Sequence, residues 1–160
     1  MHIEEADLDG DGRLDFAVAN ARTGTVTVLL GRPGASVGGF APIQLQPIAD
    51  PPGPVAVGDL NRDGLGDIVV GVDASLGTSV VIFLGTANGS FATPTVVGLT
   101  STPLALALSD LNHDGNLDLV VAHPLLGTSV LLGTGTGSFS PPTEVPIGSQ
   151  SFAVNVADMN

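Results

Sequence analysis

A nine-residue acidic segment occurs three times in this chain at near-constant spacing. It begins at Asp7, Asp59 and Asp110, so that consecutive copies start 52 and 51 residues apart. A fourth copy begins 48 residues later, at Asp158, and the sequence ends at Asn160. Repetition at such a period is typical of propellers, solenoids and other arrays of similar modules. The period therefore predicts three consecutive modules of similar structure.

Each module contains short apolar runs separated by turn residues, without a long apolar pattern at helical spacing. In the second module we expect strands at residues 55–58, 68–72 and 80–84. A weaker fourth strand, 91–97, belongs at a sheet edge because it contains Pro94. The corresponding runs are 3–6, 16–19, 26–30 and 43–45 in the first module, and 106–108, 119–122, 130–132 and 143–147 in the third. Four short antiparallel strands in about 50 residues are typical of a propeller blade, which predicts an all-β fold.

The acidic residues are concentrated in the repeated segments. Of the 16 Asp and Glu residues, 11 lie in the three segments and the partial fourth one. Numbered from the first aspartate, each segment has side-chain oxygens at positions 1, 3, 5 and 9, and a glycine at position 6 that permits a sharp bend. Ca²⁺ prefers six to eight oxygen ligands, and the backbone carbonyl of position 7 can add one. The sequence predicts about one Ca²⁺ per complete module.

The expected ligands follow from these positions in each segment. They are Asp7, Asp9, Asp11, Arg13 and Asp15 in the first segment, Asp59, Asn61, Asp63, Leu65 and Asp67 in the second, and Asp110, Asn112, Asp114, Asn116 and Asp118 in the third. Arg13, Leu65 and Asn116 would bind through their carbonyl oxygens. The first segment has one more carboxylate than the others, so we expect it to bind Ca²⁺ most tightly.

Other interpretations of the segments are weaker. An EF-hand loop begins in the same way but requires a bidentate Glu at position 12, where this chain has Val18, Val70 and Val121. A turn without metal would leave converging carboxylates to repel one another. Mg²⁺ is disfavoured because its small octahedral shell fits such loops poorly.

Charge and composition exclude several other functions. The net charge is −12, and four Lys and Arg residues cannot neutralise a nucleic-acid backbone. No apolar run approaches the ~20 residues of a membrane-spanning helix, and residues 1–5 lack the features of a signal peptide. The chain has no cysteine, and His123 has no Cys or His partner at metal-ligand spacing. We expect no nucleic-acid partner, no membrane insertion and no enzymatic activity.

Further features recur in every module. An apolar strand follows the acidic segment, the third strand ends in Leu-Gly, and a Gly-x-Phe sequence closes the module at Phe40, Phe91 and Phe139. Together with the acidic segments, these features resemble the FG-GAP, or VCBS-type, repeat of integrin-like β-propellers over nearly the whole chain. The resemblance implies one Ca²⁺ in the loop between the first and second strands of each blade. It also implies an extracellular or cell-surface location for the parent protein.

Three blades do not complete a propeller, which usually has four to eight. We expect residues 1–160 to form a half-propeller that closes a six-bladed ring as a homodimer; the alternative is a longer parent protein with further blades. The partial fourth module, 152–160, resembles the first strand of a blade, whereas Glu5 makes the N-terminal strand a poor innermost strand. The tail of one copy would then complete blade 1 of the other. Asp158 and Asn160 would compete there with the first two aspartates of the first acidic segment.

The expected function is that of a non-catalytic, calcium-stabilised scaffold, a fragment of a secreted or surface adhesion or interaction protein. The alternative is a carbohydrate-binding propeller lectin, although sugar sites usually stack a ring on Trp or Tyr and this chain has neither. A propeller enzyme would need a cluster of His, Tyr, Arg or Lys at the axis, which the sequence lacks. The sequence does not indicate which protein or glycan the scaffold would bind.

Overall fold

The structure, a computed structural model, describes residues 2–33, 39–44, 48, 51–74, 77–124, 127–145 and 153–154. Within these residues the chain is built from β-strands, with one 3₁₀ turn at Ala87–Gly89. The strands form three four-stranded antiparallel sheets and a two-stranded hairpin. The predicted all-β class is therefore confirmed, and each sheet corresponds to one predicted module.

The three sheets, called blades 1 to 3 here, follow one another along the chain. Blade 1 has the order β1 (His2–Ala6), β2 (Asp15–Asn20), β3 (Thr25–Gly31) and β4 (Phe40–Gln44). Blade 2 consists of β5 (Pro52–Gly58), β6 (Asp67–Ala74), β7 (Gly77–Phe83) and the edge strand β10 (Thr95–Gly98). Blade 3 consists of β11 (Ala105–Ser109), β12 (Asp118–His123), β13 (Gly127–Leu131) and β14 (Thr143–Val145). The hairpin joins β8 (Gly85–Thr86) to β9 (Ser90–Phe91).

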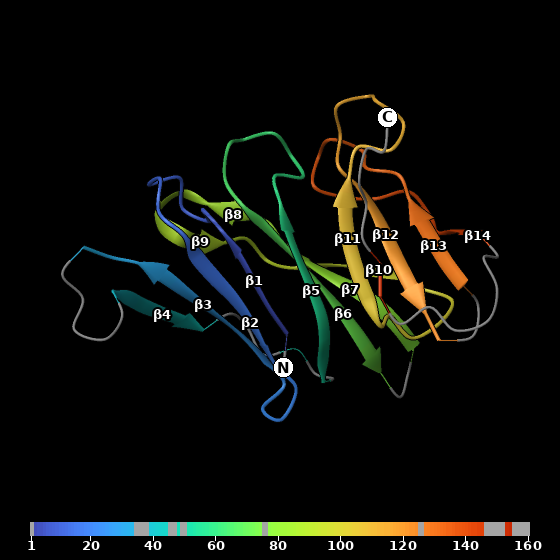
Figure 1. Ribbon diagram of the computed structural model, residues 1–160, viewed down its shortest axis with the longest axis horizontal. Helices are drawn as coiled ribbons and strands as arrows, with labels where there is room; N and C mark the ends of the chain where they lie inside the picture. The colour runs from blue at the N-terminus through green and yellow to red at the C-terminus, as the bar shows by residue number, and fades with distance from the viewer. Residues whose placement is uncertain are drawn as a thin grey trace.

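The blades lie side by side, and their first strands are neighbours: β5 lies between β1 and β11 (Figure 1). The acidic segments connect β1 to β2, β5 to β6 and β11 to β12, and all three lie at the same end of the molecule (Figure 1). This fanned arrangement of antiparallel sheets is propeller-like. It places the three candidate metal loops in a row.

Two apolar cores lie between successive blades, and β6 contributes to both. Ile68, Val70 and Val72 pack in the core shared with blade 1, whereas Val69 packs in the core shared with blade 3. Successive side chains of a strand point to opposite faces of the sheet. Because neighbouring blades cover both faces, β6 is apolar at consecutive positions instead of alternating. The continuous apolar run in the sequence is explained by this double coverage.

The structure corrects some strand boundaries. The fourth strand expected at 91–97 is not continuous: Phe91 ends β9, the segment containing Pro94 is irregular, and β10 begins at Thr95. Leu132 follows the end of β13 instead of lying within it. Leu45, Ile147 and most of the partial fourth module, residues 152 and 155–160, lie outside the described residues.

Ala153 and Val154 are the described part of the partial fourth module. They border a cavity that is also lined by residues of all three first strands, including Glu4, Val55 and Leu106. This cavity lies where the first strands of the blades converge. The expected pairing of the tail with blade 1 of another copy stays a prediction.

Candidate metal centre

The three acidic segments fold into the same loop, held by the carboxylate at position 1. Asp7 Oδ1 accepts hydrogen bonds from the backbone N–H groups of Gly10 (2.8 Å) and Asp11 (3.1 Å). Asp7 Oδ2 accepts a third from Gly12 (2.7 Å). In the other two segments the equivalent bonds, 2.8–3.1 Å long, join Asp59 to Asp63 and Gly64, and Asp110 to Asp114 and Gly115. One short side chain thus satisfies the backbone donors that the bend leaves free.

Left-handed backbone conformations occur at two positions of every loop. The predicted bend at position 6 is confirmed, with φ of 80° at Gly12, 84° at Gly64 and 82° at Gly115. Position 4 is also left-handed, although two of its residues carry side chains: φ is 62° at Arg62 and 59° at His113. Such angles are uncommon for residues other than glycine. The residue types at position 4 did not predict this second left-handed conformation.

The aspartate at position 9 has a structural role that the sequence pattern did not predict. Asp15, Asp67 and Asp118 are all 0 % exposed. In each loop one carboxylate oxygen accepts a hydrogen bond from the backbone N–H of the leucine at position 2. The other oxygen accepts one from the glycine of the Leu-Gly pair at the end of the third strand. The distances are 2.7 and 2.7 Å for Asp15, 2.8 and 2.7 Å for Asp67, and 2.9 and 2.8 Å for Asp118.

This bridge ties the acidic segment to the end of the third strand within each blade. The glycine donors, Gly31, Gly85 and Gly133, lie 15–18 residues after the aspartate. A carboxylate offers about four lone-pair sites, so two N–H contacts leave capacity for a cation. Position 9 can therefore act as a structural clamp and as a metal ligand at once.

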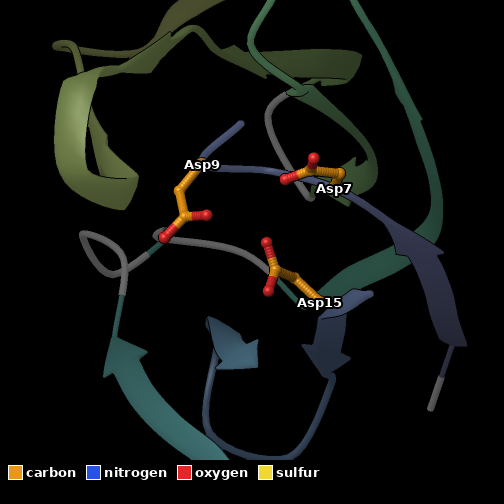
Figure 2. Close-up of side chains that lie close together, drawn as sticks. All are labelled: Asp7, Asp9 and Asp15. Atoms are coloured by element: carbon orange, nitrogen blue, oxygen red, sulfur yellow. The ribbon is translucent and has the colours of Figure 1, made fainter. Parts of the chain in front are cut away.

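The first segment brings three carboxylates together. Ligand oxygens of Asp7, Asp9 and Asp15 lie within 4.8 Å of one another. Figure 2 shows these side chains turned toward a common space. The nearest cation given by the structure is the Arg32 guanidinium, whose Nη2 lies 3.7 Å from Asp9 Oδ2. Like charges this close need a counter-charge, and oxygen donors alone suit a hard cation such as Ca²⁺.

The Asp9 carboxylate provides the most direct indication of a cation site. Its side chain is only 5 % exposed, and Oδ1 is buried without a hydrogen-bond partner among the described residues. Burial, followed by repulsion from Asp11 and Asp15, raises the pKa of Asp9 above its ordinary value. A buried carboxylate oxygen without a partner carries a large desolvation cost. The donor set of the first segment therefore fits a bound cation.

The second and third segments differ at position 3, where an amide replaces the carboxylate. Asn61 Nδ2 donates to Asp63 Oδ2, and Asn112 Nδ2 donates to Asp114 Oδ2, both at 3.0 Å. The position-3 amide therefore partly neutralises its position-5 neighbour. Hydrogen bonds, first from the Asn116 backbone and next from the Asn112 side chain, lower the pKa of Asp114. In these two loops a hydrogen bond therefore takes the place of the repulsion between carboxylates at positions 3 and 5.

In all three loops, the backbone N–H of position 7 donates a hydrogen bond to the carboxylate at position 5. The N–H of Arg13 donates to Asp11 Oδ1 at 2.9 Å, and the Arg13 guanidinium lies 3.0 Å from the other oxygen of the same carboxylate. Leu65 and Asn116 donate in the same way to position 5, at 2.9 and 2.7 Å. All predicted ligand residues therefore lie in the described loops. The coordination of an ion by the position-7 carbonyls stays a prediction.

Neighbouring loops also contact each other. Arg62, at position 4 of the second segment, donates from Nε to the carbonyl oxygen of Gly115 and from Nη2 to that of Asp114, both at 3.0 Å. These two carbonyls belong to the third segment. Arg62 therefore joins the acidic segments of blades 2 and 3.

A family comparison identifies the repeat. A protein-family model described as FG-GAP-like repeat matches residues 7–70 and 59–121. The two matches overlap and run from the first acidic segment into β12. The chain belongs to the FG-GAP-like repeat family. The resemblance stated from the sequence is thereby confirmed.

The FG-GAP-like family is generally non-enzymatic, and its repeats occur typically in extracellular proteins. No curated protein matches the chain at a significant level. Among the described residues, no helix has the length and apolar character needed to cross a membrane.

A second polar cluster lies outside the FG-GAP-like loops and was missed in the sequence. His123 is 0 % exposed, with Nε2 2.5 Å from Ser129 Oγ and Nδ1 3.1 Å from the carbonyl of Thr102. The Ser129 hydroxyl lies 2.9 Å from both carboxylate oxygens of Glu144, which also accepts the Thr100 hydroxyl. These bonds join three strands of blade 3 to the connection that precedes it. Since Ser129 is fully buried, the cluster is structural.

Proposed function

We propose that this chain is a non-catalytic segment of a β-propeller in which each acidic segment binds one structural Ca²⁺. The observation that carries the proposal is Asp9 Oδ1, which is buried without a hydrogen-bond partner among the described residues and belongs to a set of three carboxylates. A cation there would offset the desolvation of Asp9 and the repulsion between the carboxylates. The common fold of the three loops extends the proposal to the second and third segments.

The ion would stabilise the blade rather than take part in a reaction. The loop ligands connect the first two strands of each blade, and the position-9 aspartate already binds the end of the third strand. A cation held by these side chains would therefore fix three strands of a blade relative to one another. Because the ligands must be deprotonated, this stabilisation would be present above the carboxylate pKa values and lost in acid.

Calcium titration calorimetry of the whole chain tests the proposal. The expected result is about one ion per complete module, and no comparable binding of Mg²⁺, whose octahedral shell is smaller. Thermal unfolding in Ca²⁺ and in chelator provides the second arm, with a higher Tm expected in Ca²⁺. A Tm that does not respond to chelator would rule out a structural ion.

The proposed setting is a secreted or surface protein with an adhesion or interaction role, as the family membership suggests. A carbohydrate-binding propeller remains the alternative to a protein-binding one. The chain has no Trp or Tyr on which a sugar ring would stack, so the scaffold role is the one we propose. Binding of the calcium-loaded chain to a glycan array would favour the lectin alternative.

A further inference from the structure

The junctions between blades are built from contacts that repeat along the chain. The first contact is made by the leucine at position 2 of each acidic segment. Leu8 of blade 1 lies against Gly66 of blade 2, where an added β-carbon would meet Leu8 Cδ2 at 2.7 Å. Leu60, the equivalent residue of blade 2, packs in the core shared with blade 3. These leucines are 0 % and 4 % exposed.

A second contact is made by the leucine at, or directly after, the end of the third strand. Leu30 of blade 1 packs on Gly89 of blade 2, so closely that a β-carbon at Gly89 would clash with it. Leu84 of blade 2 packs in the same way on Gly137 of blade 3, where a β-carbon would meet both of its methyl groups at 2.6 Å. Blades 1 and 2 therefore each insert two leucines into the blade that follows.

Blade 3 presents the same two leucines, without a following blade among the described residues. Leu111 occupies position 2 of the third segment and is 39 % exposed; Leu132 follows the third strand and is 43 % exposed. Their equivalents in blade 1, Leu8 and Leu30, are both 0 % exposed. The end of blade 3 thus carries the inserting half of a blade junction.

Blade 1 presents the surface of a blade junction that would receive these two leucines. At position 8 of the acidic segment, a blade contacts the blade that precedes it. This position is Gly66 in blade 2 and Leu117 in blade 3. Leu117 packs in the core shared by blades 2 and 3. In blade 1 this position is Leu14, which is 57 % exposed. The face of blade 1 turned away from blade 2 also carries Phe16 and Val18, which are half-buried and alternate with Ala17 of the first core.

We propose that blade 3 of one copy packs on blade 1 of a second copy through these residues, repeating the internal junction between chains. Leu111 and Leu132 of each copy would insert into blade 1 of the other, and Leu14 would be covered. Two such contacts in a pair of copies close a six-bladed ring. The interface continues a contact that the chain already makes twice within itself, so it does not depend on the proposed Ca²⁺ sites.

One position makes the junction between copies less favourable than the internal ones. Gly58, the residue before the second segment, packs on Leu117, and a β-carbon there would meet Leu117 Cδ1 at 2.6 Å. The equivalent of Gly58 in blade 3 is Ser109, which would face Leu14 of the second copy. At the internal junction that has leucine at position 8, a β-carbon opposite it would force the Leu117 side chain to shift. Replacing Leu14 by glycine, as at Gly66, should therefore tighten the association.

Sedimentation equilibrium over a concentration series tests the proposal, in Ca²⁺ and in chelator. The expected result is a species of twice the chain mass, for which Leu111→Ala and Leu132→Ala each weaken association on the order of tenfold or more. Val96→Ala is the matched control, because Val96 is 65 % exposed on the edge strand β10, away from the junction, and should leave association unchanged. Leu14→Gly should strengthen association, which a merely unfolded variant cannot do.

Three results would overturn the proposal. A monomer at every concentration would mean that blade 3 does not pack on blade 1 of a second copy. A dimer that Leu111→Ala and Leu132→Ala leave intact would place the interface elsewhere. Mass that grows with concentration beyond two copies would show that the contact does not close a ring. Failure of Ca²⁺ binding would leave the predicted dimer in place, so the two proposals fail separately.

Discussion

Leu8 of blade 1 fills the space that a side chain at Gly66 of blade 2 would need. A β-carbon at Gly66 would lie 2.7 Å from Leu8 Cδ2, 3.1 Å from the carbonyl oxygen of Asp7 and 3.2 Å from Leu8 Cα. Two of these three atoms belong to the backbone and cannot turn away. The close approach of blades 1 and 2 therefore depends on glycine at this position.

Gly66→Ala is accordingly expected to destabilise the protein by about 1–3 kcal/mol, the usual cost of overpacking a closely packed site. Urea unfolding monitored by circular dichroism measures the change. Gly98→Ala is the control, since a β-carbon at Gly98 meets nothing within 4 Å. Equal effects of the two substitutions would show that the contact of Gly66 with Leu8 does not limit stability.

Exchanging the residues at position 3 tests the role of the buried Asp9 carboxylate. In chelator, Asp9→Asn should raise the free energy of unfolding by about 1 kcal/mol, because it removes a buried charge that Asp11 and Asp15 repel and that the 3.7 Å contact with Arg32 offsets in part. In Ca²⁺ the same substitution should weaken binding of the ion to the first segment.

The reciprocal change, Asn61→Asp, should strengthen Ca²⁺ binding to the second segment and destabilise the protein in chelator. Calorimetric titration of both variants checks this, and unaltered affinities would contradict it.

The first segment should also be the tightest of the three sites. It has four carboxylates, compared with three in each of the others. Asp11→Asn should therefore cost more Ca²⁺ occupancy at limiting ion concentration than Asp63→Asn, its equivalent in the second segment. An equal or smaller loss for Asp11→Asn would contradict this order of affinities.

Asp67 gives a pH dependence whose sign depends on the ion. Burial raises the pKa of Asp67 from 3.8 to about 6, against the opposing effect of hydrogen bonds from Gly85 and Leu60. Without metal, the native state therefore keeps a proton between pH ~4 and ~6 that the unfolded chain releases. The stability contributed by Asp67 is complete below pH ~4 and is lost as the pH rises to ~6.

Ca²⁺ should reverse this trend, because it binds the deprotonated carboxylate. Urea unfolding at several pH values, in chelator and in Ca²⁺, measures both slopes. Asp67→Asn is the control, since an amide cannot titrate in this range. If the wild type and the variant have the same pH dependence in chelator, Asp67 does not keep the proton assigned to it.

Ser129→Ala is expected to destabilise blade 3 by about 1–3 kcal/mol, because it leaves the buried Nε2 of His123 without a partner. Ser79 occupies the equivalent position of blade 2 and has no side-chain hydrogen bond to the described residues, so Ser79→Ala should have little effect. Thermal unfolding of the two variants provides the comparison. A greater loss from Ser79→Ala would contradict the assignment of the cluster.

The sequence predicted the second strand of blade 2 well because neighbouring blades cover both of its faces. The run at residues 68–72 is apolar throughout, and the structure places Ile68 and Val69 in different cores. The boundary of the fourth strand in blade 2 was less accurate. Pro94 marked the edge position correctly, but the sequence did not show that the strand breaks before Thr95.

The acidic segments were predicted as loops, with the bend at Gly12 and its equivalents. The clamp made by Asp15 could not be predicted, because its partner Gly31 lies 16 residues away and only the fold brings the two together. The same holds for Ser129 and Glu144, which lie on adjacent strands of blade 3. Local patterns indicate strands and turns, whereas contacts between distant residues require the register of the sheets.

Equilibrium unfolding at a series of free Ca²⁺ concentrations tests the central claim most directly. An ion that binds only the native state adds about 1.4 kcal/mol to the free energy of unfolding for each tenfold rise above its dissociation constant. With one ion per module, the slope should approach about 4 kcal/mol per tenfold for the three modules together. A free energy of unfolding that does not change with Ca²⁺ would contradict the account of this chain as a calcium-stabilised scaffold.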